Sequence, residues 1–219
     1  MPFSLPPLDP RITWSIRVLD VAGPAPGVVL AEYDPDRVCR TASVGKLFLL
    51  IEVARRLEAG TLDPDQHIEI PDELWVEDSG LLYRMRDRRL TVADAALLVG
   101  AVSDNLATNA LTHLAGLDAV HAVAAELGYR DTMMLDYIRE RRTPDVAWTT
   151  SYGCARELSD LIRRLGEGNE PRSPGAELLI PGVRRRVLTW LAADTDTSMV
   201  ADSLLLDPLA HVDPDYQGI

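Results

Sequence analysis

Lysine is almost absent from this sequence. Lysine and arginine together number 22 among 219 residues, and Lys46 is the single lysine. Aspartate and glutamate number 34, which leaves a formal net charge of -12. Such a chain repels phosphate backbones and anionic membrane surfaces, so neither nucleic acid nor a membrane is expected as a partner.

Cysteine and long apolar runs are also scarce. Cys39 and Cys154 are too few for a disulfide framework and lack metal-ligand spacing, so we expect two reduced thiols in or near the core. None of the four histidines belongs to a zinc pattern, and no metal or other cofactor is expected. The longest apolar run, residues 95–102, is too short to span a bilayer.

The N-terminal segment has no basic start followed by an apolar stretch, so no secretory signal is visible. We therefore expect a cytoplasmic protein, or an exported one if a signal has been removed.

The spacing of apolar residues predicts two strands followed by helices. Residues 12–20 alternate and are rich in β-branched side chains, and after a glycine- and proline-rich break the pattern resumes at 28–34, which predicts an antiparallel hairpin. Helical spacing then begins at Ser43 and stops near Gly60. Further helices are predicted near residues 92–102, 106–115, 118–127, 152–165 and 182–193.

A lone hairpin is marginally stable and leaves unpaired edges. Three explanations are open: helices cover this small sheet, another chain completes it, or the sequence stops before its own remaining strands. A homodimer through the open sheet edge is one hypothesis that follows from this pattern.

Ser43 and Lys46 stand three residues apart at the predicted helix start, so their side chains share one face. The helix N-terminus favours a developing oxyanion and disfavours a protonated lysine, as does burial among apolar neighbours. A serine nucleophile needs a base within hydrogen-bond reach, and lysine, unlike arginine, can lose its proton. The pattern alone is weak evidence, because S-x-x-K occurs by chance about once in a chain of this length.

A second polar group, Ser103, Asp104 and Asn105, follows an apolar helix. An S-D-N triplet is expected by chance in roughly a few per cent of chains of this size. The alternative reading is a polar helix end in which Ser103 caps the next helix.

The two motifs, in this order and 60 residues apart, resemble those of the serine β-lactamases and penicillin-binding DD-peptidases, and the spacing is similar to that of the class A β-lactamases. The likeness runs from the hairpin to about residue 165 and is greatest to class A-like serine hydrolases of actinobacterial type. It implies an α+β fold of the class A β-lactamase (DD-peptidase-like) kind. Residues 1–42 would then form the N-terminal β-hairpin of the α/β part, 43–180 a mainly helical subdomain, and 181–219 a C-terminal helix and tail.

The resemblance also implies a role for each motif residue. Ser43 would be the acylated nucleophile and its N–H an oxyanion donor, while Lys46 would be its base or part of the proton relay. Ser103 would pass a proton to the leaving nitrogen, Asp104 would hold the turn, and Asn105 would contact the acyl amide of the substrate.

Two departures from the family pattern concern turnover. Class A enzymes carry a water-activating glutamate in the loop after Leu135, but constant spacing puts Arg139 there, with Glu140 one residue late. Glu140 is either the deacylating base or a solvated carboxylate paired with Arg141 or Arg142. With one lysine, the chain also has no Lys-Thr-Gly triad, and the last three strands of the family fold are expected to be missing.

Two functions follow from this sequence. The first is a serine hydrolase that forms an acyl-enzyme on Ser43 with a small-molecule or peptide-like substrate such as a β-lactam, amide or ester. The alternative is a catalytically impaired, β-lactamase-like binding or scaffold protein.

Overall fold

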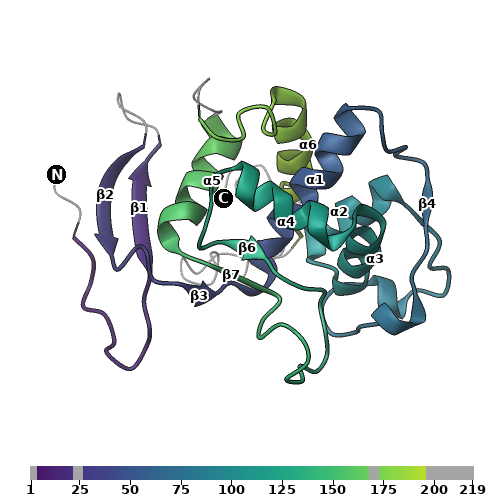
Figure 1. Ribbon diagram of the computed structural model, residues 1–219, viewed down its shortest axis with the longest axis horizontal. Helices are drawn as coiled ribbons and strands as arrows, with labels where there is room; N and C mark the ends of the chain where they lie inside the picture. The colour runs from purple at the N-terminus through teal and green to yellow at the C-terminus, as the bar shows by residue number, and fades with distance from the viewer. Residues whose placement is uncertain (1–3, 22–26, 168–172, 196–219) are drawn as a thin grey trace.

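A computed structural model describes residues 4–21, 27–167 and 173–195. The N-terminal hairpin stands at one end of the molecule, and the helices gather at the other (Figure 1). It consists of β1 (Ile16–Asp20) and β2 (Val28–Tyr33), paired antiparallel with a register shift after Val18. The predicted hairpin is thus confirmed.

The first strand begins at Ile16 rather than at residue 12, because the preceding residues form a turn around Asp9. The carbonyl of Asp9 accepts hydrogen bonds from the Ile12 N–H and from Trp14 Nε1, at 3.1 and 3.0 Å. These bonds hold the segment in a compact turn, which is incompatible with extended backbone.

Six helices make up most of the described chain. They are α1 (Lys46–Glu58), α2 (Val92–Val102), α3 (Asn105–Ala115), α4 (Leu117–Glu126), α5 (Ala155–Glu167) and α6 (Pro181–Leu191). The predicted helices are present, but two of them begin later than expected. Ser43 lies in a 3-10 turn, η1 (Ala42–Gly45), before α1, and Tyr152 belongs to a strand rather than to α5.

Short strands and turns join the helices. One antiparallel sheet contains three strands in the order β3 (Cys39–Arg40), β7 (Ser151–Gly153) and β6 (Met133–Met134). A second, two-stranded sheet pairs β4 (His67–Ile68) with β5 (Leu90–Thr91). Two further 3-10 turns, η2 (Asp72–Leu74) and η3 (Leu82–Arg84), lie between β4 and β5. None of these elements was predicted, since strands of two or three residues show no periodicity.

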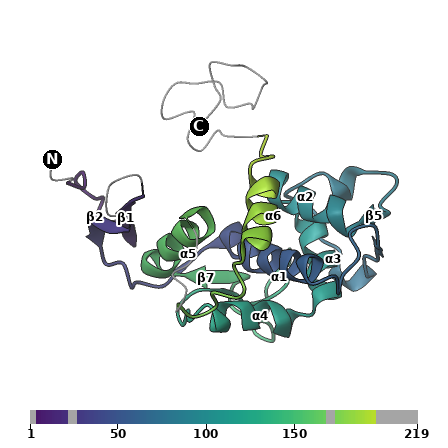
Figure 2. The ribbon, with the colours of Figure 1, turned by 90° about the horizontal axis from the view of Figure 1, so that it is seen from above.

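Helix α1 forms the centre of the core. It contacts α2, α3, α4 and α6, and Figure 2 shows it surrounded by these helices. Phe48, Leu49 and Ile51 are fully buried, and each such side chain stabilises the fold by about 1.5–3 kcal/mol. The first residue of this buried helix is Lys46, so the core fixes the position of the single lysine.

The helices of the described residues are all too short or too polar to cross a bilayer. The predicted boundaries at residues 42 and 180 stay predictions, and the tail from 196 onward lies outside the described residues.

Candidate active site

Ser43 lies on an exposed turn, and hydrogen bonds to β7 fix the backbone just before it. The Thr41 N–H donates to the Ser151 carbonyl at 3.3 Å, and Ser151 Oγ donates to the carbonyl of Ala42. Ala42 has a φ of 45°, in the left-handed region that a side chain disfavours. The turn therefore presents Ser43 outward at the expense of local strain.

Gly45 allows this turn to approach β7. A Cβ built on Gly45 would lie 2.3 Å from Ser151 Cβ, far inside van der Waals contact. Only glycine fits at this position of the S-V-G-K stretch.

Lys46 is 4% exposed and points at the S-D-N turn. Its Nζ donates to the Ser103 carbonyl at 2.6 Å, to Ser103 Oγ at 2.9 Å and to Asn105 Oδ1 at 2.9 Å. These three acceptors match the three N–H donors of an ammonium group. The two motifs thus meet in space, as the family resemblance implies.

Burial lowers the pKa of Lys46 from 10.5 to about 8, although the negative charge of Asp104 opposes the shift. Roughly one molecule in ten therefore carries a neutral lysine at pH 7, and half do at pH 8. A neutral amine has a lone pair and can accept a proton from a hydroxyl group.

The S-D-N turn joins α2 to α3. Ser103 ends α2 with a left-handed backbone, φ 52° and ψ 39°, which reverses the chain direction. Asp104, rather than Ser103, caps the next helix, because its Oδ1 accepts from the Ala107 N–H at 2.9 Å. The alternative interpretation of the triplet as a simple Ser103 cap is therefore wrong.

Asp104 also binds the segment that precedes η3. Its Oδ2 accepts from the N–H groups of Leu81 and Leu82, both at 2.7 Å, and the residue is fully buried. Gly80 permits this contact, since a Cβ there would lie 2.4 Å from Asp104 Cα. The carboxylate thus fixes two chain segments beside the lysine.

Asn105 places its side chain between Lys46 and the same segment. Besides accepting from Lys46, its Nδ2 donates to the Glu77 carbonyl at 3.3 Å, and its backbone N–H donates to the Ser79 carbonyl at 3.0 Å. The long Nδ2 contact is the weakest bond of the cluster. This amide N–H is the group most easily exchanged for a ligand carbonyl.

The loop after Leu135 is organised by Asp136, which sequence reasoning missed. Arg139 donates to its carboxylate at 2.8 and 3.0 Å and Arg142 at 2.9 Å. Burial alone would raise the pKa of Asp136, but the hydrogen bonds from both arginines bring it below its ordinary value. The signal available in the sequence was the D-x-x-R-x-x-R spacing, which places both guanidinium groups within reach of the carboxylate.

Glu140 is exposed, and within the described residues it has no hydrogen bond or ion pair. Of the two arginines considered as partners of a solvated Glu140, Arg142 binds Asp136 instead, so the alternative of a Glu140–Arg142 pair is wrong. Arg142 also donates to the carbonyls of Tyr137 and Ala147 and to Thr150 Oγ1. The buried carboxylate of Asp136 therefore binds Arg142 in preference to the solvated carboxylate of Glu140.

Asn109 connects this loop to α3 and was also missed. Its Nδ2 donates to the carbonyls of Leu74 and Ile138, both at 2.9 Å, and its Oδ1 accepts from the Ile138 N–H at 2.8 Å. An asparagine one turn after Asn105 on a buried helix face was the available signal.

The structure therefore brings Lys46, Ser103 and Asn105 into direct contact, with Asp104 behind them. The Ser43 hydroxyl makes no hydrogen bond within the described part of the chain, and Ser43 lies one turn before Lys46. No group of three or more acidic, histidine or cysteine side chains in that same part is placed to hold a metal ion.

Comparison with solved structures identifies the fold. The β-lactamase of Sphaerobacter thermophilus DSM 20745 matches with a TM-score of 0.67 and 27% identity, over 80% of this chain and 64% of that one. The ancestral (GNCA) class A β-lactamase gives a TM-score of 0.65 at 22% identity, over 81% and 65%. PBP-A gives 0.59 at 20% identity, over 76% and 58%. The predicted α+β, class A β-lactamase-like fold is thus confirmed.

Among curated proteins, the β-lactamase regulatory protein BlaB of Streptomyces cacaoi is 33% identical over 109 residues, which is 49% of this chain and 35% of that protein. The chain thus spans less than two thirds of the length of each of these relatives. The model of the β-lactamase enzyme family matches residues 10–209. This chain is a member of the β-lactamase enzyme family.

Proposed function

We propose that the chain is a serine hydrolase that acts through an acyl-enzyme on Ser43. The observation that carries the proposal is the contact of a buried lysine of lowered pKa with Ser103 Oγ, one turn from an exposed serine. The family membership supports the class of chemistry, and the substrate would be a β-lactam, an amide or an ester.

In the acylation step, Ser43 Oγ attacks the carbonyl carbon of the substrate while its proton passes to the neutral amine of Lys46. The carbon–nitrogen or carbon–oxygen bond of the leaving group then breaks. Ser103 gives its hydroxyl proton to the leaving atom and regains one from Lys46, to which it is already hydrogen-bonded at 2.9 Å. Protons balance, and the lysine returns to its neutral form.

In this proposal, Asn105 binds the substrate. Its Nδ2 would exchange the long contact to Glu77 for the carbonyl of an acyl amide, while Oδ1 keeps its bond to Lys46. Asp104 touches no reacting atom and serves as a positioning residue.

Release of the acyl group is expected to be slow. Arg139 cannot act as a general base, and its guanidinium is engaged with Asp136. Glu140 is the remaining carboxylate candidate for activating water, and it would have to turn in from an exposed position.

The second candidate function is a binding or regulatory protein that keeps the fold without turnover. It is favoured by Arg139 in the place expected for the water-activating base, and by the regulatory protein among the relatives. In this case a ligand would bind beside Asn105 while Ser43 stays unmodified.

Intact mass spectrometry after incubation with a fluorescent penicillin tests both candidates. We expect a stable adduct that Ser43→Ala abolishes, and slow or no colour change with a chromogenic cephalosporin. An adduct that persists in Ser43→Ala would refute the role of Ser43 as the nucleophile. Saturable binding with no adduct, unchanged in Lys46→Met, would establish the second candidate instead.

A further inference from the structure

The peptide group that precedes Ser43 is held by a serine on β7. Ser151 is 0% exposed, and its hydroxyl donates to the carbonyl of Ala42. The peptide group that contains this carbonyl also contains the N–H of Ser43. In a planar trans peptide the carbonyl and the N–H point in opposite directions. Because the Ala42 carbonyl points at β7, the Ser43 N–H points away from β7, toward the exposed side of the turn.

The Ser43 N–H is available to a ligand in that direction. It donates to no other group of the residues that the structure describes, and Ser43 is exposed. Under the proposed function, this N–H stabilises the oxyanion that forms when Ser43 attacks a carbonyl carbon. The direction of the N–H therefore bears on the rate of acylation.

The backbone at Ala42 depends on its surroundings for this arrangement. Its φ of 45° lies in a region that a side chain disfavours, and such a conformation persists only where neighbouring contacts determine it. The contacts here are the hydrogen bond from Ser151 Oγ and the bond from the Thr41 N–H to the Ser151 carbonyl at 3.3 Å. Without the Ser151 hydroxyl, the peptide group between Ala42 and Ser43 can rotate to relieve the strain, which turns the N–H away.

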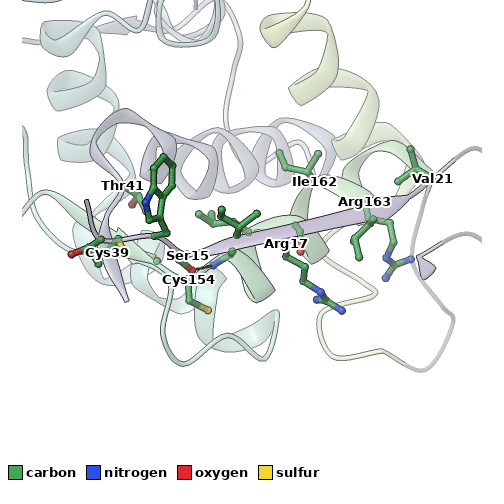
Figure 3. Close-up of a pocket in the computed structure, with 16 residues that line it drawn as sticks. Ser15, Arg17, Val21, Cys39, Thr41, Cys154, Ile162 and Arg163 are labelled. Atoms are coloured by element: carbon green, nitrogen blue, oxygen red, sulfur yellow. Dashed lines mark hydrogen bonds between the residues drawn. The ribbon is translucent and has the colours of Figure 1, made fainter. Parts of the chain in front are cut away.

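A second hydroxyl orders the protons. Thr41 Oγ1 lies 2.9 Å from Ser151 Oγ, and Figure 3 shows Thr41 at the same end of the pocket beside β1 as Cys39. A hydroxyl has one proton to donate, and Ser151 donates its proton to the Ala42 carbonyl, so Thr41 is the donor to Ser151. The bonds run in one direction, from Thr41 through Ser151 to the Ala42 carbonyl. Bonds in such a chain polarise one another, which makes the Ser43 N–H a stronger donor.

We propose that Ser151 is a positioning residue for the acylation of Ser43, because its hydroxyl fixes the direction of the Ser43 N–H. Ser151 itself touches no reacting atom. This role rests on the proposed function, since it concerns one step of that reaction.

The acylation kinetics of Ser151→Ala test this role. The maximal rate of adduct formation with a fluorescent penicillin, per folded molecule, should fall at least about tenfold. The penicillin concentration that gives half of this rate should change less than about twofold, because the oxyanion forms only in the transition state. The pH at the midpoint of the rate profile should stay near 8, since the contacts of Lys46 are unchanged.

Thr149→Val is the matched control. Thr149 is also buried, and its hydroxyl donates to the carbonyl of Ser151 at 3.0 Å, so this variant also loses one buried hydroxyl bond at β7. That bond does not involve the peptide group of Ser43, so the maximal rate per folded molecule should change less than about twofold. Thermal unfolding of each variant gives the folded fraction. Thr41→Val should slow acylation less than Ser151→Ala does, because Ser151 keeps its own bond to Ala42.

Equal maximal rates in Ser151→Ala and Thr149→Val would overturn the proposal, because the hydroxyl of Ser151 would then contribute only to packing. No adduct in the unsubstituted chain would instead refute the proposed function, and the role in acylation with it.

The direction of the peptide group is tested separately by the ¹⁵N resonance of the Ser43 amide. A hydrogen bond to the Ala42 carbonyl withdraws electron density from this nitrogen, so the resonance should move in Ser151→Ala and stay in place in Thr149→Val. A resonance that stays in place in both variants would show that Ser151 does not hold this peptide group.

Discussion

The amine of Lys46 lies 2.9 Å from Ser103 Oγ, although helix α1, the segment that carries β4 and β5, and helix α2 separate the two residues in the sequence. The same amine also contacts the Ser103 carbonyl and Asn105 Oδ1, so three acceptors surround it. In the protonated state all three N–H groups are used. Loss of one proton frees a lone pair and lets Ser103 become the donor.

The rate at which Ser43 is acylated should therefore rise with pH. The pKa of Lys46 is lowered to about 8, and only the neutral amine accepts a proton, so the rate increases through pH 8 and levels off above it. Stopped-flow measurement of fluorescent penicillin adduct formation between pH 6 and about 10 checks this. Lys46→Arg should abolish the reaction, and a profile that is flat across this range contradicts the role of Lys46.

The same pKa shift predicts how stability depends on pH. The unfolded chain holds the Lys46 proton up to about pH 10.5, whereas the folded chain releases it near pH 8. Between these values the unfolded state binds more protons, so the free energy of unfolding rises with pH. The rise is of order 3 kcal/mol for the full interval.

Denaturant titrations of the chain and of Lys46→Met at pH 7 and pH 10 measure that rise. The comparison cancels the other groups that titrate in this range. If the free energy of unfolding changed equally in the two proteins between pH 7 and pH 10, Lys46 would not be desolvated in the folded state.

Asp104→Ala should be among the most destabilising polar substitutions. The buried carboxylate accepts from the N–H groups of Leu81, Leu82 and Ala107, and removal leaves these donors without their partner. We expect a loss of roughly 3 kcal/mol or more in the free energy of unfolding. Asp94→Ala is the matched control: Asp94 lies in the exposed first turn of α2, so its loss should cost less than about 1 kcal/mol.

Gly45→Ala and Gly166→Ala should change stability in opposite directions. A Cβ at Gly45 would collide with Ser151, whereas a Cβ at Gly166, near the end of α5, would meet nothing within 4 Å. We expect a loss of at least about 2 kcal/mol for the first and a gain of about 0.5–1 kcal/mol for the second. Thermal unfolding measures both, and equal effects would contradict the close approach of η1 to β7.

The elements predicted from the sequence are those with strong periodicity. Leu47, Leu50 and Ile51 repeat with helical spacing and become the buried face of α1, and the alternating residues of β1 and β2 form the hairpin. The meeting of Lys46 with Ser103 and Asn105 was also expected, because the family resemblance places both motifs around one site.

The elements that could not be predicted depend on long-range contacts. Strand β7 is three residues long and exists because it pairs with β3 more than 110 residues earlier. Pairing of Glu140 with Arg141 or Arg142 was one of two interpretations of that residue, but the partner of Arg142 is the buried Asp136. Burial decides this competition, and the sequence does not reveal which carboxylate is buried.

Arg139 offers the sharpest test of why release should be slow. Arg139→Glu places a carboxylate in the expected position of the water-activating base, while Arg142 still neutralises Asp136 at 2.9 Å and keeps the loop in place. If a missing base limits turnover, the Ser43 adduct should have a shorter lifetime in Arg139→Glu than in Arg139→Gln, by at least about tenfold. Arg139→Gln removes the same ion pair without supplying a base, so it corrects for loosening of the loop. Decay of the adduct mass over time measures both lifetimes. Equal lifetimes would mean that the identity of the side chain at position 139 does not limit release. The limit would then be the position of residue 139 or the access of water to the acyl group.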